Sequence, residues 1–235
     1  MVPTTVSTAL ADRPVAGTVC LEAGAGTGNT TAGLLAAGAD RVYALTDDPE
    51  HARLVADRFA DAGDRLATVE ADLRECPLAD DSVELITAHA LCNLLEPVAL
   101  EAVAAELTRV AAPGAHLLVD DYAPPPEDAA VGRLFAVENA AASLATGRPA
   151  LTFYPSSVLR AAFSAHGWTV DRELTLLDPV PWTASHIEAH AEAVRSAAAS
   201  LSPTSREALL AELEGVLDDI EPESVGEMYG LAMRY

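Results

Sequence analysis

Closely spaced glycines that follow an acidic residue form the part of this chain best suited to hold a ligand. The run reads Glu22-Ala23-Gly24-Ala25-Gly26-Thr27-Gly28, and it follows directly on the apolar residues 18–21. Glycine lets the backbone turn sharply and lets a ligand lie against bare main chain, while the free N–H groups that begin a following helix face that ligand. The pattern predicts a strand, a ligand-binding turn and a helix from about residue 30.

A dinucleotide pyrophosphate is one candidate ligand for such a turn, but the spacing disfavours it. The dinucleotide fingerprint has its third glycine at the sixth position, which here is Asn29, whereas the third glycine of this chain is Gly28. Glu22 also precedes the first glycine, and a carboxylate repels phosphate and attracts a cation or a hydrogen-bond donor. A nicotinamide-dependent oxidoreductase is therefore the weaker interpretation.

The segment E-x-G-x-G-x-G resembles the first motif of the class I S-adenosylmethionine-dependent methyltransferases, and the similarity extends well beyond this short pattern. In that family the loop curls round the amino-acid end of the cofactor, whose ammonium and sulfonium groups are positively charged. The resemblance implies S-adenosyl-L-methionine as the cofactor. It also implies cofactor contacts from the loop residues Glu22, Ala23, Gly24, Ala25, Gly26 and Gly28.

The segment after the second expected strand is the candidate for binding the cofactor ribose. A carboxylate there would accept hydrogen bonds from both ribose hydroxyls. The segment reads Thr46-Asp47-Asp48-Pro49, and alignment on Asp48-Pro49 puts Thr46 at the position where the family has its acid. We expect Asp47 to reach the ribose, although the choice between Thr46 and Asp47 stays open. Asp48 suits the cap of the next helix.

Two further segments resemble cofactor-binding parts of the family. After the third expected strand, the resemblance implies that Asp72 accepts a hydrogen bond from the adenine amine and that the backbone N–H of Leu73 donates to a ring nitrogen. After the fourth, His89 lies where the family contacts the sulfonium end. His89 is the one weak candidate for a general base, and the competing interpretation is that it only packs or binds main chain. No other catalytic residue is predicted.

Alternating strand and helix patterns must position these segments. Strands are predicted over residues 18–23, 41–45, 66–70, 83–88, 115–122, 169–177 and 228–235, and helices over 30–37, 49–62, 97–111, 127–145, 156–166, 184–200 and 205–219. The alternation predicts a doubly wound α/β fold. The resemblance implies a seven-stranded Rossmann-like sheet of order 3-2-1-4-5-7-6 with the last strand antiparallel. We expect a single methyltransferase domain over 1–235, with helical cover segments at about 124–150 and 179–224.

Composition excludes several other classes of protein. No apolar run approaches the roughly 18 residues that span a bilayer, and residues 1–14 lack a signal-peptide pattern, so we expect a cytoplasmic protein without a membrane partner. Cys20, Cys76 and Cys92 match no disulfide or zinc spacing. His186 and His190 share a helix face, but no third ligand is evident. No metal site is expected.

The predicted function is methyl transfer from S-adenosylmethionine to a small-molecule acceptor. The alternative is a non-catalytic S-adenosylmethionine-binding sensor or assembly protein, which would keep the same loops. Methyl transfer from a sulfonium depends mainly on holding the reactants in line, so the sequence identifies neither the acceptor nor its nucleophilic atom. A net charge of −22 disfavours a nucleic-acid substrate. The oligomeric state is not predicted.

The charge itself points to a halophilic source. Thirty-six acidic residues face 14 basic ones, all of them arginine, and the acidic residues are spread along the chain. We predict that the protein unfolds in dilute buffer and refolds in molar KCl, because the repulsion within a compact acidic chain is screened when the Debye length falls to about 3 Å. Circular dichroism measures the transition. Full stability in dilute buffer would instead favour an acidic surface made for a basic partner.

Overall fold

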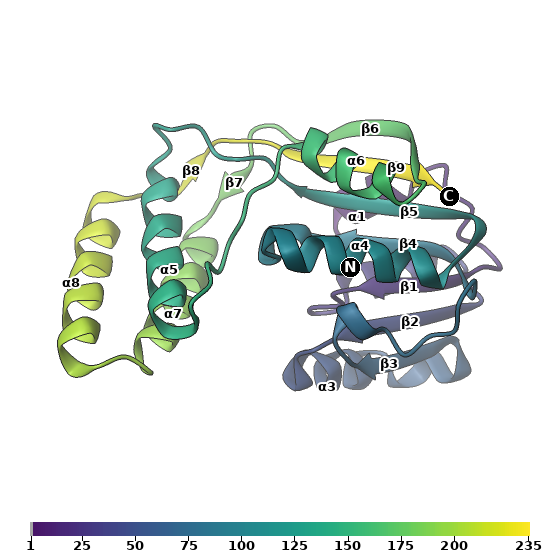
Figure 1. The fold of residues 1–235 in the computed structure, drawn as a ribbon, viewed down its shortest axis with the longest axis horizontal. Helices are drawn as coiled ribbons and strands as arrows, with labels where there is room; N and C mark the ends of the chain where they lie inside the picture. Colours follow the sequence, from purple (N-terminus) through teal and green to yellow (C-terminus); the bar gives the residue numbers. More distant parts are fainter. Residues whose placement is uncertain (1) are drawn as a thin grey trace.

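A seven-stranded mixed sheet organises the chain (Figure 1). The structure is a computed structural model that describes residues 2–235. The strands of this sheet are β1 (Val19–Ala23), β2 (Arg41–Thr46), β3 (Leu66–Glu70), β4 (Val83–His89), β5 (Ala111–Tyr122), β6 (Thr169–Leu177) and β9 (Met228–Arg234). Their order is β3-β2-β1-β4-β5-β9-β6, with β9 antiparallel to both neighbours. The predicted fold class and strand order are confirmed.

Helices cover both faces of this sheet. Helices α1 (Thr4–Leu10), α2 (Asn29–Ala36) and α3 (Pro49–Arg58) lie on one face, and α4 (Pro97–Val110) and α6 (Ser156–Ala165) lie on the other. Strands buried on both sides need apolar residues on both sides, and β1 is buried from Cys20 to Ala23. Pro49 and Pro97 begin their helices, where the missing N–H costs nothing.

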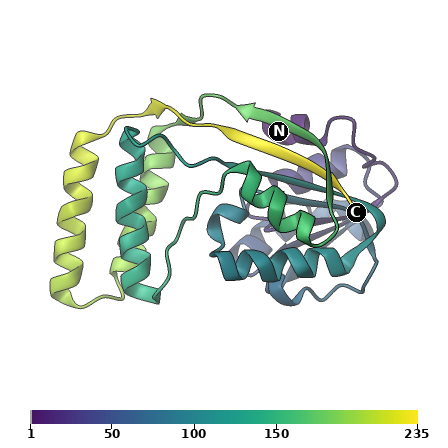
Figure 2. The same cartoon turned by 45° about the horizontal axis from the view of Figure 1, so that its top comes forward.

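Three further helices form a group of their own beside the sheet. Helices α5 (Ala130–Thr146), α7 (Ala184–Ala198) and α8 (Pro203–Asp219) stand side by side in both views (Figures 1 and 2). They share a hydrophobic core that includes Leu134, Val194 and Leu213. A short ribbon of β7 (Pro181–Trp182) and β8 (Glu223–Ser224) lies at one end. We call α5, α7 and α8 the three-helix group; it occupies the segments expected as a helical cover.

Helix α1 was not among the predicted elements. Its seven residues carry only two buried side chains, Val6 and Leu10, so they show no extended helical periodicity. Its position depends on a tertiary contact with α2, where a Cβ on Gly33 would lie 2.7 Å from Val6 Cγ1. Arg172 of β6 also donates hydrogen bonds to the carbonyls of Ala9 and Ala11, at 2.8 and 2.9 Å.

Other boundaries differ by a few residues. Strand β5 begins at Ala111, although Pro113-Gly114 had indicated a turn there. The helix predicted to residue 62 ends at Arg58, because Phe59 leaves helical geometry with φ −120°, and the 3-10 helix η1 (Ala60–Arg65) follows. All three cysteines are buried free thiols. Among residues 2–235, no helix is both long and apolar enough to cross a membrane.

The three-helix group offers a matched test of its core. Leu134 is fully buried and Leu144, on the same helix, is 62 % exposed. We expect Leu134→Ala to lower the free energy of unfolding by about 2–5 kcal/mol, because it removes buried methyl groups and leaves a cavity. Leu144→Ala should change it by about 0.5 kcal/mol or less. Denaturant unfolding in molar KCl measures both, and equal losses would contradict the packing described here.

Candidate functional site

A cleft of about 480 Å³ opens at the carboxyl ends of the first strands. The floor is formed by residues that end or follow β1, β2 and β3, namely Gly24, Thr46, Asp47, Ala71, Asp72 and Leu73. The opposite wall comes from residues before and at the start of α4, such as Leu95 and Ala99, and from the end of α5 and the segment after it, such as Thr146 and Arg148. Strand order reverses between β1 and β4, and open α/β sheets bind ligands at such a switch point.

The glycine loop leaves room for a ligand at one position in particular. Gly24 and Gly26 both have left-handed backbones, with φ +76° and +48°. A Cβ on Gly24 would lie 2.8 Å from Leu91 Cδ1, so a side chain there would displace Leu91, and the left-handed backbone itself favours glycine. A Cβ on Gly26 would meet nothing nearer than the Gly24 carbonyl at 4.0 Å. The bare backbone at Gly26 therefore faces open space.

A side chain of α3 holds the end of the glycine loop, which continues into α2. Arg58 Nη1 donates to the carbonyl of Thr27 at 2.6 Å and to Asn29 Oδ1 at 3.1 Å. Gly28 is the N-cap of α2 and supplies no capping side chain. The first N–H groups of α2 thus have no side-chain acceptor from the cap, and they suit an anionic or hydrogen-bond-accepting group.

Glu22 lies behind the loop rather than in the cleft. Its side chain is 2 % exposed and accepts a hydrogen bond from the hydroxyl of Thr31. Burial raises the pKa of Glu22 to about 7, and the hydrogen bond from Thr31 offsets part of that effect. A carboxylate that titrates near neutral pH favours a cationic neighbour, which would stabilise its charged form.

Of Thr46, which ends β2, and the two aspartates that follow it, Asp47 alone has a side chain without a hydrogen bond among residues 2–235. Asp48 caps α3 and accepts from the N–H groups of Glu50 and His51 at 2.7 and 3.1 Å. The hydroxyl of Thr46 accepts from the N–H of Asp48 at 3.2 Å. Asp47 is exposed and lines the cleft, and no hydrogen bond to its side chain is found among residues 2–235. The geometry favours Asp47 over Thr46 as a ribose ligand, which stays a prediction.

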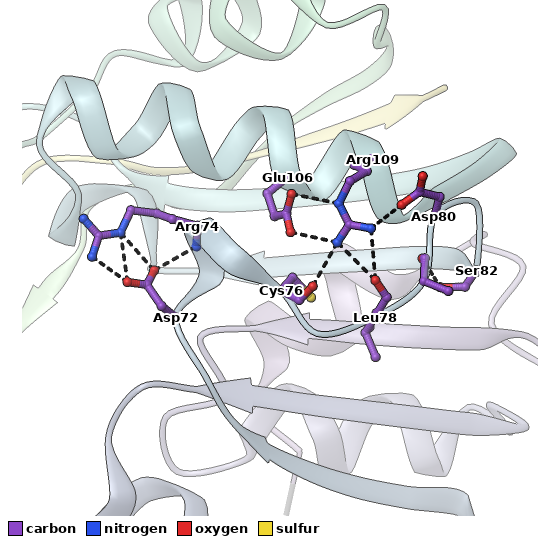
Figure 3. A network of polar contacts seen from close by, with 9 residues as sticks. Asp72, Arg74, Cys76, Leu78, Asp80, Ser82, Glu106 and Arg109 are labelled. Carbon is purple, nitrogen blue, oxygen red and sulfur yellow. Dashed lines mark hydrogen bonds and ion pairs between the residues drawn. The ribbon is translucent and has the colours of Figure 1, made fainter.

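Asp72 lies in the cleft but already has a cationic partner. Figure 3 shows Arg74 folded back on Asp72, with Nε 2.9 and 3.0 Å from the two carboxylate oxygens, while the Arg74 N–H donates at 2.8 Å. These hydrogen bonds lower the pKa of Asp72. Leu73, next to it, is mostly buried in the main core. An adenine amine at Asp72 would therefore share the carboxylate with Arg74.

Arg109 of α4 holds the segment that follows Asp72. It donates to the carbonyls of Cys76 and Leu78 at 2.9 and 3.0 Å and pairs with Glu106 and Asp80 (Figure 3). Sequence reasoning did not single out Arg109. The sequence held one signal for Arg109: it is the one basic residue in α4, and the turn before β4 is acidic.

His89 lies on the other face of the sheet from the cleft. Its Nδ1 is paired with the carboxylate of Asp120, and it lines a small space with Thr30 and Leu10. Burial disfavours the charged ring, but the hydrogen bond to Asp120 and nearby carboxylates outweigh that effect and raise the pKa of His89. Ala90 follows with φ +46°, a strained conformation for alanine, and Leu91 then lines the cleft.

The end of β5 adds acidic residues that sequence reasoning missed. Asp121 is 1 % exposed and accepts from the N–H groups of Asn93 and Tyr122 at 2.9 and 2.8 Å. Burial raises its pKa to about 7. The available signal was a pair of acids, Asp120 and Asp121, that ends an apolar run at the carboxyl edge of the sheet.

The predicted site residues thus fall into three places. Gly24, Asp47, Asp72 and Leu73 meet in the cleft. Within the glycine loop, Ala23, Ala25 and Gly28 are buried, and Gly26 faces open space. Glu22 and His89 lie on the α1 face of the sheet. No group of three or more metal-ligating side chains is found in the part of the chain described.

Comparison with known proteins finds similarity to methyltransferases over part of the chain. Residues 20–114 match the model of a family described as a methyltransferase domain. Demethylmenaquinone methyltransferase of Clavibacter sepedonicus is 37 % identical over 123 residues, 52 % of this chain and 48 % of the relative. The chain therefore spans about half the length of this curated relative. Residues 20–114 are therefore similar to methyltransferase domains.

Solved structures share the fold over nearly the whole chain. A putative methyltransferase from Bacillus halodurans has a TM-score of 0.66 at 14 % identity, covering 99 % of both chains. The [4+2]-cyclase SpnF has 0.65 at 18 %, covering 98 % of this chain and 80 % of its own. Geranyl diphosphate C-methyltransferase from Streptomyces coelicolor has 0.63 at 13 %, covering 97 % and 76 %. These likenesses establish the fold alone.

The buried Glu22 carboxyl predicts a pH effect on stability. Its folded pKa of about 7 lies above the ordinary 4.5, so its favourable contribution is full below pH 4.5 and is lost as pH rises through 7. In the wild-type protein this loss lowers the free energy of unfolding on the order of 3 kcal/mol. Glu22→Gln keeps an acceptor for Thr31 and should not show this fall. The buried Asp121 carboxyl should still leave some dependence of the unfolding free energy on pH in that variant.

Thermal unfolding between pH 5 and 8, in molar KCl, measures this effect. Glu207→Gln, on the exposed surface of α8, is the matched control and should follow the wild-type curve. An unchanged pH dependence in Glu22→Gln would show that the Glu22 carboxyl does not titrate in this range.

Proposed function

We propose that this protein transfers the methyl group of S-adenosylmethionine to a small-molecule acceptor. The observation that carries the proposal is the cleft at the strand switch point, where Gly24, Asp47 and Asp72 meet within a segment that matches the methyltransferase family model. The match covers only 48 % of the relative's length. The activity of the whole chain is therefore part of this proposal.

The residues present fit each part of the cofactor. Asp72 and the backbone of Leu73 would bind adenine, and Asp47 would accept from the ribose hydroxyls. The open backbone at Gly26 leaves room for the amino-acid end, and Glu22 behind the loop favours its positive charge. When bound, the cofactor supplies an activated methyl group on a positively charged sulfur.

The protein's contribution to catalysis is mainly positional. Holding a nucleophile in line with the methyl carbon and excluding water can supply about 7–11 kcal/mol of barrier reduction. The end of α5 lines the same cleft as the loop, which supports a role for the three-helix group in shaping the acceptor site. A net charge of −22 weighs against nucleic acid, and two of the similar proteins are named as methyltransferases of demethylmenaquinone and of geranyl diphosphate.

A cofactor-binding protein without methyl transfer is the second candidate function. We keep this candidate because the fold of this chain resembles that of a [4+2]-cyclase, and one fold can host several chemistries. A sensor or an assembly protein belongs to the same class of alternatives. The cleft would be the same in each case, so only turnover separates them.

We also propose a domain organisation, a compartment and a salt adaptation for this protein. The 235 residues act as one domain, with the three-helix group as its cover, since the end of α5 completes the cleft. The protein works in the cytoplasm, which its three buried free thiols support. It is adapted to a halophilic, high-salt cytoplasm, which the charge of −22 and the lack of lysine support.

Calorimetry in molar KCl tests the cofactor site. The protein should bind both S-adenosylmethionine and S-adenosylhomocysteine, and Gly26→Val should weaken binding at least tenfold because it fills the open space. Gly17→Val is the matched control: Gly17 also has a left-handed backbone and open surroundings, but it precedes β1 at the opposite edge of the sheet. Equal affinity of both variants would contradict the site.

Turnover is tested with the cofactor labelled on its methyl carbon. Demethylmenaquinone and geranyl diphosphate, taken from the relatives' names, lead a panel of small phenols, amines and carboxylic acids. Label transfer to any of these supports a methyltransferase. Cofactor binding without transfer across the panel would favour the second candidate.

A further inference from the structure

Two of the fourteen arginines of this acidic chain line the cleft, and they differ in how their side chains are paired. Arg74 lies on the floor, where its Nε and its backbone N–H both donate to the carboxylate of Asp72. Arg148 lies on the opposite wall, in the segment after α5. Its one side-chain contact among residues 2–235 runs from Nη1 to the carboxylate of Glu96, at 3.4 Å. Arg148 is therefore the cation of the cleft that keeps free hydrogen-bond donors.

The guanidinium of Arg148 has an unused edge. Its Nε and Nη2 donate to no acceptor within residues 2–235, and neither atom is among the buried atoms that lack partners. The side chain is 58 % exposed, so these donors are open to solvent. The parallel N–H groups of such an edge match the two oxygens of a carboxylate or phosphate group. The free edge therefore suits an oxyanion.

The charge of Glu96 distinguishes an anionic ligand from a cationic one at this place. Glu96 is the N-cap residue of α4, and the partial positive charge of a helix N-terminus stabilises a nearby carboxylate. Because Glu96 contacts only Nη1 of Arg148, the pair leaves the other edge of the guanidinium free. A cation at Glu96 would have to displace Arg148, whereas an oxyanion can add to the existing pair.

The segment that carries Arg148 is held on both of its sides. The side-chain amide of Asn139, on α5, accepts from the N–H of Leu151 at 2.7 Å and donates to its carbonyl at 3.0 Å. Thr152 then donates its N–H to the carbonyl of Asn93, in the loop between β4 and α4, at 2.6 Å. Figure 2 shows this segment running from the three-helix group back to the sheet. The backbone of Arg148 thus has a defined place across from the floor.

The side chains around the ion pair are mostly apolar. On the two walls they include Leu94, Leu95, Ala99, Val103, Ala142 and Pro149.

Leu94 is 57 % exposed although it lines the cleft. A ligand that covers it removes apolar surface from water, which favours binding. The walls therefore combine an apolar surface with one incompletely paired guanidinium.

We propose that Arg148 determines acceptor specificity by binding an oxyanion group on an acceptor whose remaining body is apolar. The inference rests on the proposed function and deepens it, since it names the chemical class of the acceptor. Arg148 binds the oxyanion at the wall, away from the glycine loop on the floor. It acts in binding and not in the chemical step.

The charge of the whole chain does not oppose an anionic acceptor at high salt. A net charge of −22 repels anions in dilute buffer. In molar KCl the Debye length is about 3 Å, so carboxylates further away are screened. A charge-assisted hydrogen bond at contact distance is then the main electrostatic interaction of the bound oxyanion.

Two fluorescent dyes that share one aromatic body test this inference. 8-Anilinonaphthalene-1-sulfonate carries an oxyanion, and N-phenyl-1-naphthylamine lacks it. In protein mixed with excess S-adenosylhomocysteine in molar KCl, Arg148→Gln should weaken binding of the sulfonate dye about tenfold, because a charge-assisted hydrogen bond is lost. It should change the affinity of the neutral dye by less than about twofold, because the apolar wall is intact. Fluorescence titration measures both affinities.

Arg133→Gln is the matched control. Arg133 also lies on the α5 side, is 52 % exposed and pairs with Asp219, but it does not line the cleft. Its substitution should leave both dye affinities unchanged. Arg148→Lys keeps the charge and loses the planar edge, so it should retain part of the affinity for the sulfonate dye. All three variants should unfold like the wild type, since the substituted side chains are exposed.

Competition experiments identify the oxyanion and the place of the dye. Benzoate and phenyl phosphate should displace the sulfonate dye, and the stronger competitor shows which oxyanion the site prefers. Displacement by neither would contradict an oxyanion site. Displacement by S-adenosylhomocysteine would place the dye on the floor and overturn the assignment of an acceptor subsite.

The remaining outcomes separate this inference from the proposed function. Unchanged sulfonate affinity in Arg148→Gln would overturn the role of Arg148, and an equal loss for both dyes would reduce it to packing. No saturable binding of either dye would contradict the apolar wall. If calorimetry detects no S-adenosylhomocysteine binding, the proposed function fails, while an Arg148-dependent affinity for the sulfonate dye would still establish an anion site in the cleft.

Discussion

The parallel pairing of β1 with both β2 and β4 is the constraint on which the rest of the structure depends. It brings the carboxyl ends of three strands to one edge, and the chain must then turn away from that edge in opposite directions. The turn after β1 needs a left-handed residue at Gly24, and Leu91 from beyond β4 packs against that glycine. The same pairing makes His89 a neighbour of the loop. Both the cleft and the histidine pair are thus consequences of one hydrogen-bonded ladder.

Acidic groups at this edge are arranged by their degree of burial. Asp47 is exposed to solvent, and Asp72 is paired with Arg74, which lowers the pKa of Asp72. Glu22 and Asp121 are enclosed, and burial of a charge without a cationic partner is expensive. The sheet edge therefore holds carboxyl groups ready to be stabilised by a positive ligand. The cost of burying these carboxylates and their preference for a cationic ligand have the same electrostatic origin.

Local signals in the sequence predicted most of the sheet, because they act over a few residues. The apolar run before Gly24, the proline at the start of α3 and the cap at Asp48 each fix their element without distant contacts. The strand order followed from resemblance rather than from physical reasoning. Helix α1 was missed because tertiary contacts with Gly33 and Arg172 hold it. The pairs of Asp72 with Arg74 and of His89 with Asp120 were missed because they depend on rotamers and on strand pairing across 31 positions.

Helix α5 serves two parts of the molecule at once. One face, with Leu134 and Ala141, packs in the core of the three-helix group, and another, with Ala142 and Thr146, lines the cleft. The floor of the cleft is set by the sheet and does not share that core. Substitutions that repack the three helices can therefore reshape the α5 wall of the cleft while its floor stays unaltered. Under the proposed function, the choice of acceptor could then diverge through positions that never touch a ligand.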